Sequence, residues 1–561
     1  MVLTKRTACI MMKHIGKLAL AADWLGKGKS MNQFFTDKQG KPMLLLGLQA
    51  MNSSTGSPLM AQAIQAVQRY GGNVLEAPIY WHAIEPEMDR YDLSLVQGLI
   101  DQARQANLHL ILLWFGTSKN GHPNYAPEYV KLDPQTYQIT VGPNGAQHAS
   151  LSPHCMATLE RDRKAFCEVM TFLQQVDGDI GTVLAVQIEN EMGYANTDRD
   201  YSTLACADYE KPLPEALRGV ALEDCGACDG SATWRGQFGR HAHEAFSAWY
   251  HARYIGAIAR AGKAIYALPM ITNVMVGELN IQEAGVCYNA GAAVGRVLDI
   301  WKAGAPELDL LCPDIYTPVR SEYTRIAARY AREDNALFIP ESAIGGEANA
   351  INAMLAFADY GCIGLCCFGA ERALRPDGTL KDECRTMMMT MRAINGLAPL
   401  LIRYRGTGRV HALVQEEFAT EQYLKLEHFH VVAHFFRGGG QRVQSTQFDV
   451  SAPEYAYHAS ERGRALLVEV SEYEYFLAGA GVAVDFLRRP EPQDDNPFPA
   501  LGSRQSTQLN FLSVEEGHFD ADDQWHVDFL RNGDQSNFQL FVHGGEAVRI
   551  RLNPGMAVKV V

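Results

Sequence analysis

The sequence has little cysteine, no long hydrophobic run and no basic block, and each shortage excludes a class of protein. Its 12 cysteines in 561 residues are too few for a disulfide framework. No apolar run approaches the roughly 18–20 residues of a membrane-spanning helix. The formal charge is 50 − 64 = −14 with no cluster of lysine and arginine, so we expect neither a nucleic acid nor a membrane as partner. A neutral or cationic small molecule, or another protein, suits this charge better.

Several cofactor and nucleophile motifs are also missing. The chain has no phosphate-binding GxxxxGK[ST] loop, no zinc-binding HExxH and no GxSxG turn around a nucleophilic serine. Cys225 and Cys228 form one CxxC pair, with Cys206 upstream. A zinc site needs four ligands, so simple thiols are favoured here and a metal is the alternative. We expect no metal and no cofactor.

The N-terminal segment bears on cellular location. Residues 5–24 are apolar in two short pieces, separated by Lys13, His14 and Lys17. These charges interrupt the run of about 7–15 apolar residues that a secretory signal needs. Four other cysteines lie inside apolar runs, as buried thiols do in a reducing compartment. We expect a cytoplasmic protein and regard a periplasmic or secreted one as less favoured.

The first 400 residues alternate between apolar runs of strand length and helical patterns. Continuous apolar runs are typical of parallel strands buried on both faces. The runs are 43–49, 73–81, 109–115, 182–189, 266–276, 308–316, 336–343 and 362–369. The helical patterns are 57–71, 92–107, 158–177, 234–265, 296–303, 322–334, 346–360 and 381–404. Eight such pairs predict a (β/α)₈ TIM barrel.

The alternative is a doubly wound open sheet, but the glycine-rich first turn of that fold is missing. Beyond residue 404 the pattern changes to short β-rich runs separated by turns, with a proline-rich and aspartate-rich connector at 489–497. This texture predicts a β-sandwich-like domain. We therefore divide the chain into a catalytic barrel with an N-terminal extension, residues 1–404, and a β-rich accessory domain, residues 405–561.

Two glutamates lie at the ends of apolar runs, where a charged side chain is unexpected. Glu191 follows the fourth run and Glu341 ends the seventh. Active sites of TIM barrels lie at the carboxyl ends of the strands, so both side chains should face one cavity. Two carboxylates on one cavity are the minimum equipment for glycoside hydrolysis. The alternative is that each glutamate pairs with a basic residue at the rim.

Three stretches resemble a known enzyme family. Gln187-Ile-Glu-Asn-Glu-Met-Gly193 is similar to the strand-4 motif of glycoside hydrolase family 35 β-galactosidases, which belong to clan A. The segment 73–86, with its Trp and Glu-Pro, resembles strand 2 of that family. The β-rich tail, including 474–482 and 512–517, resembles the C-terminal domain of a bacterial branch related to families 35 and 42.

The resemblance implies roles for four residues. Glu191 would be the general acid/base and Glu341 the nucleophile of a retaining mechanism. Asn190 would contact the sugar 2-hydroxyl, and Tyr316 would hydrogen-bond to the nucleophile. Glu189 lies two residues before Glu191, which in a regular strand places it on the same side; we expect a buried supporting residue there and keep it as the rival acid.

Other candidate substrate contacts follow from position. Trp81 and Trp114 end the second and third runs and could stack on a sugar ring, although a core position suits each equally. Lys119 and Asn120 could donate to sugar hydroxyls or belong to a solvated loop. Glu371, after the eighth run, could bind a hydroxyl or pair with Arg372.

Two departures from the family concern specificity. Residues 112–116, Leu-Leu-Trp-Phe-Gly, replace a motif that usually follows strand 3, and Pro78 occupies the position of a tyrosine that contacts galactose. The resemblance implies an exo-acting β-galactosidase that removes terminal β-galactose from oligosaccharides. A homo-oligomer is compatible with this expectation. The alternatives are a β-glucosidase or β-fucosidase of the same clan, and a barrel that binds carbohydrate without turnover.

Overall fold

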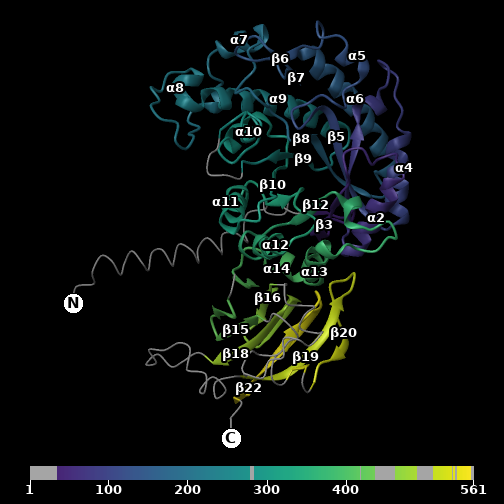
Figure 1. Ribbon diagram of the computed structural model, residues 1–561, viewed down its shortest axis with the longest axis vertical. Helices are drawn as coiled ribbons and strands as arrows, with labels where there is room; N and C mark the ends of the chain where they lie inside the picture. The colour runs from purple at the N-terminus through teal and green to yellow at the C-terminus, as the bar shows by residue number, and fades with distance from the viewer. Residues whose placement is uncertain are drawn as a thin grey trace, which may run out of the picture.

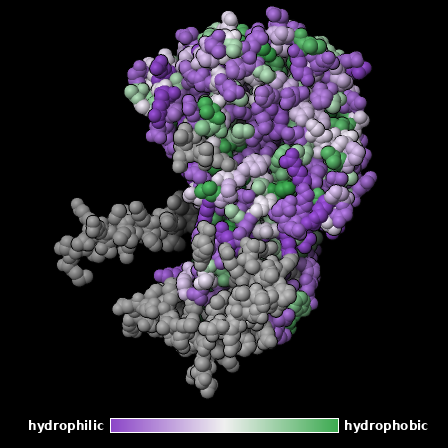
Figure 2. Space-filling model, in the orientation of Figure 1, coloured by the Kyte–Doolittle hydropathy of each residue, from purple (hydrophilic) through white to green (hydrophobic). Residues whose placement is uncertain are grey.

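The computed structural model describes residues 35–277, 283–416, 419–435, 462–488, 509–532, 535–536 and 540–557. The N-terminal segment 5–24 and the connector 489–497 lie outside the described residues. Figure 1 shows two parts, a large barrel of strands and helices and a smaller pair of sheets that follows it in the chain. Figure 2 shows mainly hydrophilic residues on the described surface of the barrel, with apolar residues scattered among them.

Eight parallel strands form the barrel, in the neighbour order β10-β9-β8-β5-β4-β3-β12-β11. They are β3 (Leu45–Gln49), β4 (Val74–Tyr80), β5 (His109–Lys119), β8 (Val183–Asn190), β9 (Met270–Met275), β10 (Leu310–Asp314), β11 (Phe338–Ile339) and β12 (Gly364–Phe368). The ring closes between β10 and β11, where Ile315 N–H donates to the Glu341 carbonyl at 2.9 Å. The predicted TIM barrel is confirmed, and the open sheet is wrong.

The interior of the barrel changes from apolar to polar along the strands. Leu45, Val74 and Ile271 belong to an apolar cluster inside the ring. Because side chains alternate along a strand, residues two or four positions later share the same interior side. Those positions hold polar side chains near the carboxyl ends of the strands: Gln49, Glu76, Asn273 and Asp314. The polar layer is the floor of the candidate site.

Helices cover the outside of the ring. The main ones are α2 (Leu59–Tyr70), α4 (Ser94–Gln105), α6 (Met156–Asp177), α9 (Ala242–Ile265), α10 (Leu298–Gly304), α11 (Arg320–Tyr330), α12 (Glu347–Asp359) and α13 (Asp382–Gly396). Shorter helices are α3 (Trp81–Ile84), α5 (Glu128–Lys131), α7 (Thr203–Tyr209), α8 (Trp234–Phe238) and α14 (Ala398–Tyr404). Two short antiparallel pairs join β1 (Phe35–Thr36) with β2 (Pro42–Met43) and β6 (Ile139–Val141) with β7 (Gln147–Leu151).

Two helices predicted as continuous are broken. The pattern at 234–265 splits into α8 and α9 at Gly239, whose φ of 51° and ψ of −123° lie outside the helical region. Little room remains at Gly239, since an added Cβ would lie 2.1 Å from the Cys225 carbonyl oxygen. The pattern at 381–404 splits into α13 and α14, where Pro399 lies in the first turn of the second helix.

Two antiparallel sheets follow the barrel. The six-stranded sheet has the order β13-β16-β17-β22-β19-β20 and the four-stranded sheet β14-β15-β18-β21. The strands are β13 (Val410–Val414), β14 (Glu421–Lys425), β15 (Phe429–Phe435), β16 (Arg464–Ser471), β17 (Glu474–Ala480), β18 (Val482–Arg488), β19 (Leu509–Phe519), β20 (Trp525–Leu530), β21 (Leu540–Val542) and β22 (Ala547–Ala557). A shared apolar core between the two sheets confirms the β-sandwich-like fold.

The six-stranded sheet packs against the side of the barrel. Its outer apolar residues, including Val468 and Phe476, are part of the same core as the barrel helices. The buried Arg464 crosses this contact, donating to Thr390 Oγ1 at 2.7 Å and to the Thr386 carbonyl at 2.9 Å in α13. Figure 1 shows the sheets beside α12, α13 and α14. The sandwich therefore completes the hydrophobic core at the barrel's flank.

Candidate active site

The carboxyl end of β8 carries two glutamates in an unusual backbone conformation. Glu189 has a φ of 60° and Glu191 a φ of 48°, both in the left-handed region that side chains other than glycine rarely adopt. Such backbone strain is concentrated at functional sites. The left-handed turns also break the alternation of the strand, so the two side chains leave β8 toward different surroundings.

Glu189 is enclosed by hydrogen-bond donors from the end of β5. Its carboxylate accepts from the Thr117 N–H, the Thr117 hydroxyl and the Ser118 N–H, each at 2.8 Å, and from the Gly116 N–H at 3.2 Å. Its acceptor sites are thus occupied by the protein itself. The expectation that Glu189 shares a side with Glu191 is wrong because of the left-handed residues, and we assign it a structural role in holding the β5 loop.

Glu341 is held by three donors from three different strand ends. Tyr316 Oη donates to its Oε2 at 2.8 Å, while Asn273 Nδ2 and Asn190 Nδ2 donate to its Oε1 at 3.2 and 3.3 Å. The side chain is 4 % exposed. Donors of this kind stabilise the ionised form of a carboxyl and fix its direction. The bond from Tyr316 to Glu341 is the contact that the resemblance implied, whereas Asn190, expected at the sugar 2-hydroxyl, donates to Glu341 in this structure.

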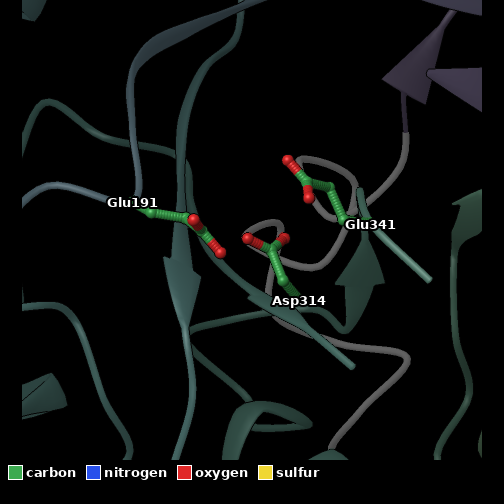
Figure 3. Close-up of side chains that lie close together, drawn as sticks. All are labelled: Glu191, Asp314 and Glu341. Carbon is green, nitrogen blue, oxygen red and sulfur yellow. The ribbon is translucent and has the colours of Figure 1, made fainter. Parts of the chain in front are cut away.

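A third carboxyl group belongs to the same cluster. Glu191, Asp314 and Glu341 each offer an oxygen, and these oxygens lie within 4.8 Å of one another. Figure 3 shows Asp314 between the two glutamates, with all three carboxyl groups turned toward a common centre. Asp314 Oδ2 accepts from Asn273 Nδ2 at 2.8 Å. Sequence reasoning missed Asp314, although it ends an apolar run as Glu191 and Glu341 do.

The proximity of these groups controls their protonation. Burial, then the charge of Glu341, raises the pKa of Glu191 to about 7 from its usual value of 4.5, against a smaller opposing effect of Lys119. Burial and the two glutamates raise the pKa of Asp314 well above its usual range. A carboxyl group with a pKa near 7 can act as a general acid at neutral pH. The arrangement therefore offers one proton donor beside one oriented carboxylate.

Asn273 connects the whole cluster and was also missed. Besides its bonds to Asp314 and Glu341, its Oδ1 accepts from the Glu191 N–H at 3.0 Å and from Gln187 Nε2 at 3.1 Å. It is 2 % exposed and lies within β9. An amide side chain inside the apolar run 266–276 was the available signal, because a buried amide needs partners for both its donor and its acceptor groups.

Both predicted stacking tryptophans lie in the core. Trp81 and Trp114 have no exposed surface, so neither presents a ring face to a ligand. Trp81 Nε1 donates to Glu85 at 2.9 Å and Trp114 Nε1 donates to Asp162 at 2.8 Å. Buried indoles need such acceptors for their N–H groups. The prediction that these rings contact sugar is wrong, and their buried acceptors explain their positions.

The other predicted contacts lie around the cluster. Lys119, 7 % exposed, hydrogen-bonds through its ammonium group to Asn190 Oδ1. Asn120 is half-buried with a φ of 55°, and its N–H donates to the Asn190 carbonyl at 3.0 Å. Glu371 accepts from the Met51 N–H at 3.1 and 3.2 Å. Lys119 and Asn120 thus support Asn190, and Glu371 is tied to the loop after β3.

Metal ligation has one candidate geometry in the part of the chain that the structure describes, the three carboxyl groups of Glu191, Asp314 and Glu341. The ammonium group of Lys119 lies beside them, which disfavours a cation at this place. The sulfur atoms of Cys225 and Cys228 lie 3.0 Å apart. The Cys206 thiol instead donates a hydrogen bond to the Tyr201 carbonyl, and the three cysteines are not among the groups placed to share a metal ion in the described part of the chain.

Residues 57–264 match a family model described as beta-galactosidase, a stretch that includes Asn190 and Glu191 and ends before Glu341. The barrel is that of a glycoside hydrolase. Residues 391–543 of this glycoside hydrolase match a second model, a domain of unknown function (DUF5597). That match begins within α13 and extends through most of the two sheets. No curated protein matches the sequence significantly.

Several solved structures resemble the glycoside hydrolase at low identity. The catalytic domain of β-amylase from Paenibacillus polymyxa is 12% identical with a TM-score of 0.46, covering 62% of this chain and 96% of that one. A β-galactosidase from Bacillus circulans sp. alkalophilus is 12% identical with a TM-score of 0.47, covering 65% and 58%. The exo-β-1,4-mannosidase Op5Man5 from Opitutaceae bacterium strain TAV5 is 12% identical with a TM-score of 0.42, covering 64% and 61%. The chain thus spans about three fifths of the β-galactosidase and the mannosidase. Among the described helices, none is long and apolar enough to cross a membrane.

Proposed function

We propose that this glycoside hydrolase is a retaining exo-β-galactosidase that removes terminal β-D-galactosyl residues from oligosaccharides. The observation that carries the proposal is the approach of the Glu191 and Glu341 carboxyl oxygens to within 4.8 Å. Retaining glycosidases place the two groups roughly 5–5.5 Å apart, whereas inverting ones need about 6.5–9.5 Å to admit a water molecule between them. The short separation favours direct attack by Glu341. The match to a β-galactosidase family model supports galactose as the sugar.

In the first step, Glu341 attacks the anomeric carbon while Glu191 protonates the leaving oxygen. The glycosidic bond breaks, a bond between Glu341 and the sugar forms, and the proton of Glu191 leaves with the aglycone. Tyr316, Asn190 and Asn273 hold the attacking carboxylate in place. The pKa of Glu191, about 7, keeps a proton available for transfer at neutral pH.

In the second step, Glu191 acts as a base. The ester at Glu341 no longer carries a negative charge, which removes the charge that raises the pKa of Glu191 in the free enzyme. Glu191 then accepts a proton from water, which attacks the anomeric carbon and releases the sugar with its configuration retained.

Azide separates the two roles. In Glu191→Ala, azide should take the place of water and yield the β-glycosyl azide, because attack follows formation of the intermediate. In Glu341→Ala, azide should replace the nucleophile and yield the α-glycosyl azide. An exposed glutamate variant, Glu128→Ala, serves as the matched control and should show no azide product. The reverse stereochemistry would exchange the two roles, and no rescue in either variant would refute double displacement.

A β-glucosidase or β-fucosidase is the second candidate. Pro78, buried on β4, stands where family 35 enzymes carry a galactose-contacting tyrosine, so the contact to the sugar must differ. A panel of p-nitrophenyl β-galactoside, β-glucoside and β-fucoside compares these sugars directly. We expect kcat/KM to be highest for the β-galactoside; a preference for the β-glucoside would overturn the galactose assignment while leaving the mechanism intact.

A further inference from the structure

The third carboxyl group of the cluster has no part in the two-carboxylate reaction, yet it lies between the two reacting groups. Asp314 is 2 % exposed at the end of β10. Its Oδ2 accepts from Asn273 Nδ2 at 2.8 Å, while its Oδ1 has no donor group directed at it. In Figure 3 the Asp314 carboxyl faces that of Glu191. Oxygens of the two carboxyl groups lie within 4.8 Å of one another, and a hydrogen bond between two carboxyl groups requires one of them to carry the proton.

We propose that Asp314 is a positioning residue that stays protonated throughout turnover and donates a hydrogen bond to Glu191. This inference rests on the roles proposed above for Glu191 and Glu341. Asp314 lies beside both glutamates, so a charge on it would meet repulsion from each of them. The surroundings of its two oxygens also suit a proton held on Oδ1. Oδ2 already accepts from Asn273, whereas Oδ1 receives no hydrogen bond and could donate to Glu191.

Counting charges supports the same assignment. In the free enzyme, ionised Glu341 and the Lys119 ammonium cancel if Glu191 and Asp314 are both protonated. In the covalent intermediate, Glu341 is an uncharged ester and Glu191 is ionised, so the sum with Lys119 is again zero if Asp314 keeps its proton. An ionised Asp314 would leave a net negative charge in both states of a buried site, which is costly.

The other titratable groups near this cluster do not change the count. Burial, then the charge of Glu341, raises the pKa of Glu76, on the interior of β4, well above its usual range, which favours its uncharged form. Tyr316, Cys312 and Tyr330 also lie near Asp314, and burial raises the pKa of each well above its usual range. Lys119 is the only cation that acts on both Glu191 and Asp314 among the described residues.

The consequence for catalysis concerns Glu191 after it has given up its proton. A hydrogen bond from Asp314 stabilises the Glu191 carboxylate and aims its free oxygen at the water that enters in the second step. The proton of Asp314 is not transferred, so the balance of the reaction is unchanged. Asp314 thus limits how far Glu341 raises the pKa of Glu191 and keeps its direction fixed.

The test uses two substitutions of the full-length enzyme. Asp314→Asn replaces a protonated carboxyl by an amide that can accept from Asn273 and donate to Glu191. Asp314→Ala removes the donor, and loss of a hydrogen bond to a charged group should lower kcat by about 10–100-fold. We expect D314N to recover most of that loss and to keep the basic limb of its pH profile within about 0.3 of the wild-type position. In D314A the basic limb should move to higher pH.

Two outcomes overturn the proposal. If D314N moves the basic limb to lower pH by a unit or more, its effect is removal of a charge, and Asp314 is ionised in the wild type. If D314A matches the wild type in kcat and pH profile, Asp314 does not act on Glu191. Asp101→Asn, an exposed site on α4, controls for effects of substitution as such.

Infrared difference spectroscopy tests the protonation without requiring activity. At pH 9, where Glu191 is ionised, the wild type minus D314N should show the carbonyl stretch of one protonated carboxylic acid. Absence of that band would refute a protonated Asp314. If the band is present but no glycoside is cleaved, the proposed function fails while the protonation stands, so the two failures are distinguishable.

Discussion

Glu189 and Glu191 leave the same strand end for different surroundings. Glu189 accepts four hydrogen bonds from Gly116, Thr117 and Ser118, whereas Glu191 faces two further carboxyl groups. The left-handed φ values of both residues make this separation possible. One glutamate therefore anchors the loop after β5 and the other remains available for proton transfer.

The pH dependence of activity should report Glu191. Its pKa of about 7 in the free enzyme means that the acid loses its proton above neutrality, so kcat/KM should fall above about pH 7. A substrate with a poor leaving group, such as a galactosyl disaccharide, makes the acid necessary and the basic limb steep. In Glu191→Gln the basic limb should disappear. A wild-type limb at pH 9 or above would contradict the assignment.

Glu191 should make the free energy of unfolding depend on pH. The pKa of Glu191 is raised on folding, so its contribution is fully present below about pH 4.5 and is lost as pH rises through about 7. Glu191→Gln cannot ionise and should therefore exceed the wild type in free energy of unfolding by up to about 3 kcal/mol at pH 8. The difference should vanish near pH 4.5. Urea unfolding at both pH values measures it, with D101N as a surface control.

Removal of the Lys119 charge should raise the pKa of Glu191 further. The ammonium group lowers the pKa of both Glu191 and Asp314, and it bonds to Asn190. We expect Lys119→Met to move the basic limb of kcat/KM upward and to lower kcat by about 10–100-fold through loss of a preorganised charge. Lys131→Met, at an exposed position on α5, is the control. An unchanged pH profile would show that Lys119 does not act on the acid.

Trp114 should matter for stability and not for sugar binding. Its indole N–H donates to Asp162, which also accepts from the Tyr254 hydroxyl at 2.9 Å. Trp114→Phe leaves Asp162 short of one donor in a buried place and should lower the free energy of unfolding by about 1–3 kcal/mol. KM for the galactoside should stay within about two-fold, as no ring face reaches the site. A tenfold rise in KM with unchanged stability would instead indicate stacking on the sugar.

Much of the fold follows from pattern alone. Eight continuous apolar runs separated by helical patterns suffice for a closed barrel, because parallel strands buried on both faces need helices around them. Pattern does not reveal where a helix is interrupted by a close contact, as Gly239 shows beside the Cys225 carbonyl. The β-rich texture predicts a sandwich but not that Phe476 packs into the barrel's core.

The site was predictable where a residue type is rare for its place. Glu191 and Glu341 stand out as charges at the ends of apolar strands, and Asp314 gives the same signal. The direction of Glu189 could not be foreseen, since a left-handed residue in a strand has no marker in sequence. The sequence could not assign Trp81 and Trp114, because an indole ring suits a buried core and a sugar-stacking surface equally. Their buried hydrogen-bond acceptors, Glu85 and Asp162, are visible only in the structure.

The hydrogen bond that closes the barrel uses the carbonyl of Glu341 itself, with the Ile315 N–H as donor. Any opening of this seam between β10 and β11 would therefore move the proposed nucleophile away from both Glu191 and Tyr316. Local unfolding confined to this seam would abolish activity even while the rest of the barrel stays folded. The hydrogen-exchange rate of the Ile315 amide therefore reports how often this part of the active site opens.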